Sequence, residues 1–233
     1  MNNIRPKYIK PVLSGAWLKL IAIIAMVIDH VAIEFFVKGD PIRPYLRGIG
    51  RIAFPIFCFL LVEGALKTNN IKKYALRLFI FALVSEIPFN LVGFKSFWYI
   101  QKQNTFFTLL LGLLMVWILQ KTTSNLWLIV GVFGCGFAAY LMKTDYGMWG
   151  IALILAFYVA TIFPEAGFSL FIILMFFKGG SEYWGLFSII PIALYNGERG
   201  KQFGHILYLV YPVHLMIIHI LWCLTNGTSI FTF

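Results

Sequence analysis

Residues 14–37 read SGAWLKLIAIIAMVIDHVAIEFFV, and this stretch decides what kind of protein the chain forms. From Ala16 to Val37 it is mostly apolar over about 22 residues, enough for a helix to cross roughly 30 Å of hydrocarbon. Ser14 stands where helices prefer an N-cap residue. The sequence therefore predicts a membrane-spanning helix here.

Four ionisable residues interrupt this apolar stretch: Lys19, Asp29, His30 and Glu34. Such groups are costly in hydrocarbon and usually face a protein interior or a water-filled cavity. Lys19 and His30 are eleven residues apart, close to three helical turns, so they share a face about 16 Å apart along the axis. Two interpretations stay open. Taken singly, Lys19 is a lysine at the membrane interface and His30 is a buried histidine with its hydrogen bonds made. Taken together with Asp29, the two residues favour an intramembrane site.

The composition of the whole chain also indicates a membrane protein. Of 233 residues, 61% are hydrophobic and 12% charged, and the mean hydropathy is +0.85. Soluble domains are about half apolar and a quarter charged. The sequence predicts an all-α, polytopic integral membrane bundle, one domain over residues 1–233 with a basic cytoplasmic segment at 1–13. About nine spans are expected, or ten if one lies in the joins, at residues 16–37, 49–66, 74–93, 105–120, 126–142, 147–163, 166–178, 183–195 and 205–224.

The net charge of +10 comes from basic residues in short loops between apolar segments. There they set topology and contact anionic membrane lipid, and with no nucleic-acid motif we expect no nucleic-acid partner. Cys58, Cys135 and Cys223 stand singly in apolar segments and form no metal spacing, so no metal is expected. The Lys and Arg bias, ten residues against seven, favours a cytoplasmic N-terminus in a bacterial inner membrane.

With that orientation, polar residues of several predicted spans fall at one depth. They are Asp29, His30, Arg51, Glu86, Asn104 and Asp145. Carboxylates, a guanidinium and an imidazole at one level indicate a built polar site. The alternative is an ion-pair network that only holds helices together, which an Arg51–Glu86 pair would satisfy. Pro55 and Pro88 are expected to bend or break their helices beside this level.

A basic segment at residues 67–77, KTNNIKKYALR, lies at the predicted inner face. Its cations include Lys72, Lys73 and Arg77. Anionic lipid and the phosphates of a cofactor both remain open as its ligands.

Residues 204–219, GHILYLVYPVHLMIIH, carry His205, Tyr208 and His214. Pro212 prevents their assignment to one helical face. A satisfied buried histidine is favoured here over a metal ligand, because no zinc spacing is present.

Six stretches of the chain resemble the TraX family. They are residues 13–30, 50–78, 85–91, 103–114, 145–150 and 208–215. TraX proteins are membrane proteins linked to N-acetylation of conjugative pilin, and they are related to the transmembrane acyltransferase superfamily. Lys19 and His30 resemble that superfamily's pattern of a basic residue, a ten-residue gap and a histidine.

The resemblance implies an acyl-CoA donor, in the first place acetyl-CoA, and an amine or hydroxyl acceptor of unknown identity. A pilin-like N-terminus and a glycan both remain open. The donor-binding candidates, with phosphates near the inner face, are Lys19, Lys72, Lys73, Arg77, His205, Tyr208 and His214.

His30 is the expected general base, with a His-linked acyl intermediate as the second possibility. A neighbouring carboxylate would orient the imidazole and raise its basicity. Asp29 is adjacent in sequence and cannot share the face of His30. Glu86 or Asp145 is therefore the expected partner of His30.

The remaining candidates receive supporting roles. Asp29 is expected to pair with Arg51, and Arg51 or Asn104 to stabilise the developing oxyanion. The competing function is a proton-coupled secondary transporter, since intramembrane Asp, Glu and His form proton relays and broken helices line transport sites. Against it, the sequence shows no paired halves and no repeated broken helices.

Overall fold

The computed structural model describes residues 11–201 and 206–228, and this part of the chain is helical without strands. The helices are α1 (Gly15–Phe35), α2 (Arg43–Gly50), α3 (Ala53–Lys67), α4 (Ile71–Phe94), α5 (Thr105–Lys121), α6 (Asn125–Ile129), the π-helical η1 (Val130–Gly134), α7 (Cys135–Leu141), α8 (Gly147–Ile162), α9 (Pro164–Lys178), the 3-10 helix η2 (Gly180–Ser188), α10 (Ile189–Ala193) and α11 (Ile206–Asn226). The predicted all-α class is confirmed.

Four helical stretches within the described residues are long and apolar enough to cross a membrane. They are Gly15–Phe35, Arg43–Lys67, Ile71–Phe94 and Leu207–Asn226. Thr105–Lys121, Asn125–Leu141 and Gly147–Ile162 are apolar but shorter. The predicted segments coincide with helical structure, but a count of nine or ten spans is not confirmed.

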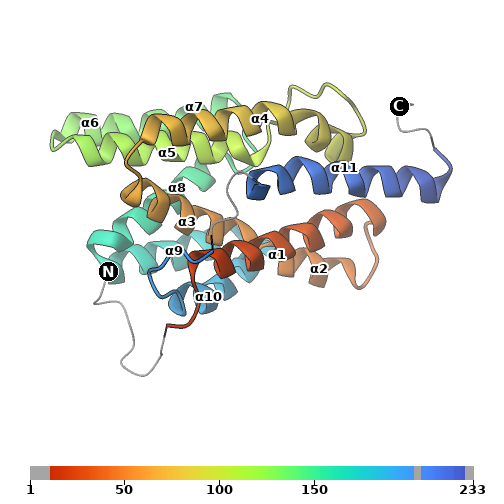
Figure 1. The fold of residues 1–233 in the computed structure, drawn as a ribbon, viewed down its shortest axis with the longest axis horizontal. Coiled ribbons are helices and arrows are strands. Elements are labelled where there is room, and N and C mark those ends of the chain that lie inside the picture. The colour runs from red at the N-terminus through yellow and green to blue at the C-terminus, as the bar shows by residue number, and fades with distance from the viewer. Residues whose placement is uncertain (1–10, 202–205, 229–233) are drawn as a thin grey trace.

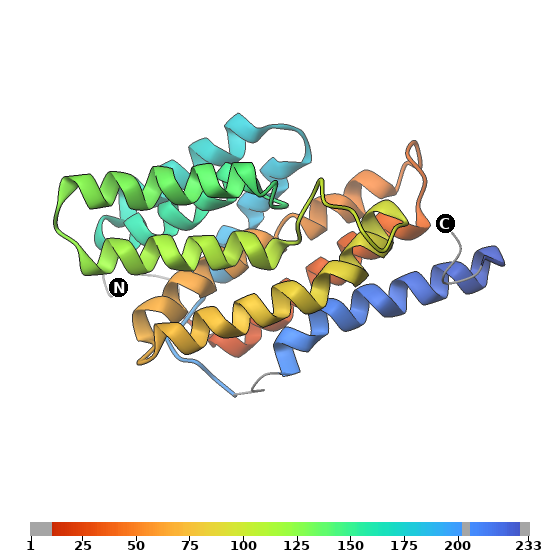
Figure 2. The same cartoon turned by 90° about the horizontal axis from the view of Figure 1, so that it is seen from above.

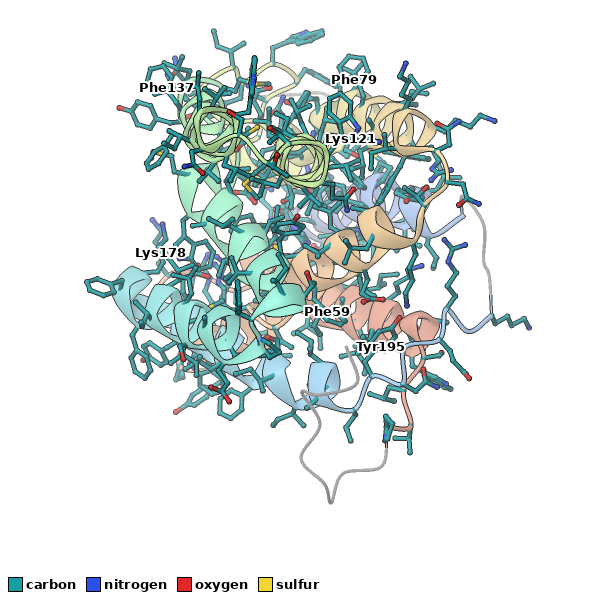
Figure 3. All side chains as sticks on the ribbon, turned by 90° about the vertical axis from the view of Figure 1, so that its left-hand side faces the viewer. Phe59, Phe79, Lys121, Phe137, Lys178 and Tyr195 are labelled. Carbon is teal, nitrogen blue, oxygen red and sulfur yellow. The ribbon has the colours of Figure 1, made fainter. Side chains whose placement is uncertain are left out.

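The outer surface of the bundle is apolar over long stretches. On α4 the exposed side chains include Leu76, Phe79 and Leu83, and on α7 they include Phe137. Figure 3 shows Phe79 and Phe137 on the outside of the upper layer. A water-soluble protein rarely exposes so large an apolar area, whereas lipid tails cover it at no cost. The chain is a helical membrane protein.

The helices pack around α3, which contacts α1, α5 and α8. In Figure 1 the helices α4 to α7 form an upper layer, while α1 and α2 lie below. Figure 2 shows α11 running beside α4, and α11 also packs against α1. This arrangement places α1 between α2, α3 and α11, so its ionisable face points into the protein.

Two prolines behave differently in the helices that contain them. The helix is interrupted at Arg51–Ile52, and Pro55 stands in the first turn of α3, where a missing N–H is tolerated. The break expected beside Pro55 is therefore present. Pro88 lies inside a continuous α4, so a break there is not observed.

The segment before α1 is tied to the segment after α10. The backbone N–H of Gly15 donates to the carbonyl of Glu198 at 2.8 Å, and that of Ala16 to Arg199 at 3.0 Å. The first N–H groups of a helix lack partners within the helix, and these carbonyls supply them. The pairing fixes Arg199 beside the start of α1.

Candidate functional site

A cavity of about 810 Å³ follows α1 through the bundle. The α1 residues that line it are Gly15, Lys19, Ile23, Met26, Asp29, His30 and Ile33. Most are three or four positions apart, which is one face of a helix. Asp29 and His30 both line the cavity, so the expectation that they cannot share a face was wrong. Between Gly15 and Ile33 the helix rises about 27 Å. The prediction that Lys19 and His30 share a face is confirmed.

Two histidines meet beside this cavity, and one of them, His30, lines it. Nε2 of His214 lies 3.0 Å from Nδ1 of His30, and their ring centroids are 5.0 Å apart. Nδ1 of His30 is also 2.9 Å from the carbonyl oxygen of Met26, and Nδ1 of His214 is 2.7 Å from that of Val210. Each imidazole is thus held by its own helix and by the other ring.

These contacts fix the protons of two neutral imidazoles. A carbonyl oxygen only accepts hydrogen bonds, so each Nδ1 carries the proton that it shares with Met26 or Val210. Nε2 of His214 is then an acceptor facing the N–H of His30. Nε2 of His30 keeps its lone pair, and no hydrogen bond to it occurs among the described residues. His30 is arranged as a proton acceptor.

One end of the cavity, the arginine end, carries eight charged side chains. They are Asp29, Arg43, Arg47, Arg51, Lys102, Asp145, Lys178 and Glu182. Arg47 donates to Asp29 at 2.8 Å, and Arg51 lies 3.1 Å from Glu182. Burial raises the pKa of the Glu182 carboxyl, and the charge of Arg51 opposes that rise.

The turn between α7 and α8 brings Asp145 to this end. Lys102 contacts one oxygen of Asp145 at 2.7 Å, and the Thr105 hydroxyl donates to the other at 3.0 Å. An isolated bridge between Gln103 and Thr144 joins the same two segments. The start of α5 therefore holds the Asp145 carboxylate in place.

The opposite end of the cavity, the lysine end, is defined by Lys19, Glu63, Lys67, Arg77 and Arg199. Lys67 forms an ion pair with Glu63 at 2.6 Å. The lysine end therefore contains four cationic side chains and one carboxylate. Tyr74 and Tyr208 also line it, and the guanidinium of Arg77 lies 5.5 Å from the centre of the Tyr74 ring.

Comparison with known proteins gives the family. Residues 14–222 match the family described as TraX protein. The chain belongs to the TraX family. The probable fimbrial assembly protein FimC, serogroup H1, of Dichelobacter nodosus is 31% identical, over 88% of this chain and 94% of that protein. No solved structure matches. The predicted TraX membership is confirmed.

The structure of this TraX protein brings several predicted site residues together. Those that line the cavity are Lys19, Asp29, His30, Arg51, Arg77, Asp145 and Tyr208. His214 also belongs to the site, but it contacts His30 instead of standing among the predicted phosphate ligands. His205 lies outside the described residues. Lys72 and Lys73 are exposed on α4 and do not line the cavity.

The predicted charge pairs were wrong. Asp29 pairs with Arg47 and not with Arg51, because α2 runs beside α1 and places Arg47 at that level. Arg51 pairs with Glu182, which η2 supplies, and not with Glu86. No carboxylate of the described residues bonds to the ring of His30, where Glu86 or Asp145 was expected. The ring of His30 contacts the imidazole of His214 instead.

Asn104 and Glu86 form a helix cap, away from the cavity lining. The Asn104 side-chain oxygen accepts from the N–H of Phe106, and its NH₂ donates to Glu86 and to the Ala82 carbonyl. Glu86 also accepts from the Asn104 backbone N–H at 2.9 Å. Both NH₂ protons have partners, so the expectation that Asn104 stabilises an oxyanion is not supported by this arrangement.

Glu34, the fourth ionisable residue of α1, lies outside this site. It is buried, pairs with Lys95 at the end of α4, and lies 3.3 Å from Nδ1 of His219 on α11. This contact joins α1, α4 and α11. It accounts for an acidic residue that the sequence left unassigned.

The cavity also contains residues that sequence reasoning did not assign to the site, among them Arg43, Arg47, Tyr211 and Glu182. A signal for the first two was available, since Arg43, Arg47 and Arg51 recur every four residues along one helical face. Tyr211 approaches His30 edge-on, with ring centroids 6.1 Å apart. Nothing near Glu182 in the sequence indicates its partner, because Arg51 is distant along the chain.

Proposed function

We propose that this TraX-family protein is a membrane-embedded acyltransferase that moves an acetyl group from acetyl-CoA to an amine or hydroxyl acceptor. The observation that carries the proposal is the cavity that joins Lys19 to His30 along one face of α1. A transferase of this kind needs an anion-binding region for its donor and a proton acceptor some distance away. We further propose a bacterial inner-membrane location with a cytoplasmic N-terminus.

The lysine end fits the phosphates of coenzyme A. Four cations face one carboxylate there, and Lys19 is half-buried with Arg199 as an electrostatic neighbour. Two nearby cations raise each other's energy, which a bound polyphosphate would relieve. The pantetheine arm would then lie along the apolar middle of the cavity, past Ile23 and Met26, towards His30.

His30 would act as the general base. As the acceptor nitrogen or oxygen attacks the thioester carbonyl, its proton passes to Nε2 of His30. The carbon–sulfur bond then breaks, and the proton is returned to the departing thiolate. His214 keeps His30 in the required tautomer. Arg51 at the arginine end is the candidate to stabilise the oxyanion.

We propose a pilin chain as the first acceptor to test. The Dichelobacter nodosus relative is named a probable fimbrial assembly protein. Membership in the TraX family also supports a pilin-related role. A glycan acceptor is the second choice, because an amine or a hydroxyl would meet His30 in the same way.

A proton-coupled transporter is the second candidate function. It is favoured by a polar cavity that follows α1 for most of the helix length and is lined by His30, which contacts His214, and by carboxylates at several levels. A transporter would move its substrate across the membrane of proteoliposomes in the absence of coenzyme A. An acyltransferase would not.

The deciding experiment measures acetyl-CoA binding to the purified protein in detergent, with thioester hydrolysis followed in the same samples. Wild type is compared with Lys19→Ala, His30→Ala and Lys72→Ala. Lys72 is the matched control, since it is exposed and off the cavity. We expect Lys19→Ala to weaken binding at least about tenfold and Lys72→Ala to leave it unchanged. His30→Ala should bind but not hydrolyse. Absence of binding by wild type at millimolar acetyl-CoA would reject the proposal.

A further inference from the structure

The arginine end holds more positive charge than its own carboxylates neutralise. Five cationic side chains face three carboxylates, Asp29, Asp145 and Glu182. Each of these carboxylates already has a cation within 3.1 Å. A surplus of two positive charges around one cavity is unfavourable unless an anion or water compensates it.

Arg43 and Lys178 carry this surplus. Neither forms an ion pair with a carboxylate within the described part of the chain. Arg43 uses its Nε to donate to the carbonyl of Ala32, which anchors the side chain against α1 and leaves its two terminal NH₂ groups. Lys178 is exposed, its Nζ lies 5.6 Å from the centre of the Trp149 ring, and it acts on Glu182 only through space.

Arg51 adds an unused buried donor. Its Nε is buried and has no hydrogen-bond partner among the described residues, although its NH1 group contacts Glu182. A buried N–H without a partner is unfavourable, because it has lost water and gained no acceptor. The arrangement therefore offers directed donors as well as excess charge.

A purely structural role for these charges explains the pairs but not the surplus. The Asp29–Arg47 and Arg51–Glu182 pairs tie α2 to α1 and η2. Those contacts need two cations and two carboxylates. Neither pair includes Arg43 or Lys178, and the contacts of these two side chains with the Ala32 carbonyl and the Trp149 ring do not neutralise their charge.

From this we infer that the arginine end binds the anionic group of the acyl acceptor, which is a molecule with a carboxylate or phosphate close to the amine or hydroxyl that is acylated. The inference rests on the proposed acyltransferase function. His30 lies between the two ends, so donor phosphates at Lys19 and an acceptor anion at Arg43 reach it from opposite directions. Guanidinium groups suit both anions because they donate in parallel to two oxygens.

The test uses two matched pairs of probe acceptors with acetyl-CoA. One pair is the amidated dipeptides Ala-Asp and Ala-Asn, and the other is glucosamine 6-phosphate and glucosamine. Wild type should acetylate the anionic member of at least one pair with a kcat/KM about tenfold higher than its neutral counterpart. The pair that shows the preference distinguishes a carboxylate from a phosphate.

Arg43→Gln and Lys178→Gln should each reduce that preference severalfold while acetyl-CoA affinity stays unchanged. Lys178 is exposed, so its variant keeps the test valid if Arg43→Gln fails to fold. Lys19→Gln should do the reverse, weakening acetyl-CoA and keeping the preference. Equal use of anionic and neutral probes by wild type would overturn the inference. So would a loss of acetyl-CoA affinity in Arg43→Gln as large as that in Lys19→Gln.

Probe binding is also measured by calorimetry without donor. This keeps the two proposals separable. If wild type does not bind acetyl-CoA, the acyltransferase proposal fails, while tighter binding of the anionic probes would still support an anion site at Arg43. If acetyl-CoA binds and neither anionic probe binds more tightly than its neutral partner, the anion site alone is rejected.

Discussion

Nε2 of His214 lies 3.0 Å from Nδ1 of His30, a contact between α11 and α1 across 184 residues of sequence. It connects the two helices at the middle of the cavity and determines which nitrogen of His30 is free. The Met26 carbonyl supports the same tautomer from within α1. The proposed base is therefore held by one helix and oriented by another.

This contact predicts that His214 is a positioning residue. His214→Ala should lower the acetyl transfer rate by up to about 100-fold, because His30 loses the ring that orients it. Acetyl-CoA affinity should stay near the wild-type value. His214→Gln should recover part of the rate, since its amide oxygen can accept from His30. Single-turnover transfer measured beside calorimetric binding checks both statements.

The control for this prediction is His219→Gln. His219 is also a buried histidine of α11, but it contacts Glu34 instead of His30. A transfer rate in His219→Gln that falls as far as in His214→Ala, per folded molecule, would show that the effect comes from α11 packing and not from the pair.

The sequence was informative wherever a pattern along one helix carries the information. Apolar runs located the helices, and the eleven-residue spacing placed Lys19 and His30 in one cavity. Both patterns are local properties of a helix. The spacing of Arg43, Arg47 and Arg51 is equally local and could have been used.

The charge pairs could not be predicted in the same way, because partners between helices depend on packing. Asp29 meets Arg47 because α2 lies close to α1: a Cβ at Gly50 would be 2.3 Å from the Cβ of Asp29. Arg51 meets Glu182 because η2 packs against α2 and α3. Depth in the membrane alone does not choose among partners at one level.

The Asp29–Arg47 pair should show strong energetic coupling. Asp29→Ala leaves a partly buried guanidinium without its partner, and Arg47→Ala does the same to a carboxylate that is 14% exposed. We expect each single variant to lose about 1–3 kcal/mol of unfolding free energy and the double variant to lose less than their sum. Unfolding of all four proteins in one detergent gives the coupling energy. Additive losses would mean that the 2.8 Å contact contributes nothing by itself.

Gly167 should be essential for the packing of α9 on α8. A Cβ at this position would lie 2.2 Å from the backbone nitrogen of Ala160, and backbone cannot move aside as a side chain can. We expect Gly167→Ala to destabilise the protein by about 1–3 kcal/mol. Gly93→Ala is the matched control, because a Cβ there meets nothing within 4 Å in α4. Because alanine favours a helix more than glycine does, Gly93→Ala should leave the stability of the protein unchanged or slightly higher. Equal melting temperatures for both variants would contradict the close contact.

Asn104 provides the sharpest separation between a structural and a catalytic role. Its side-chain oxygen caps α5, and its NH₂ is bound by Glu86 and the Ala82 carbonyl. Asn104→Ala removes the cap and the NH₂ hydrogen bonds to Glu86 and the Ala82 carbonyl, while Glu86 still accepts from the backbone N–H of residue 104, so we expect a loss of about 1–3 kcal/mol of unfolding free energy. Transfer per folded molecule should be unchanged, whereas loss of an oxyanion donor lowers kcat by about 100-fold or more. Asn104→Asp keeps the capping oxygen but removes the NH₂ donors beside Glu86, so it should also be unstable. A fall in kcat in a fully folded Asn104→Ala protein would restore Asn104 to the catalytic set.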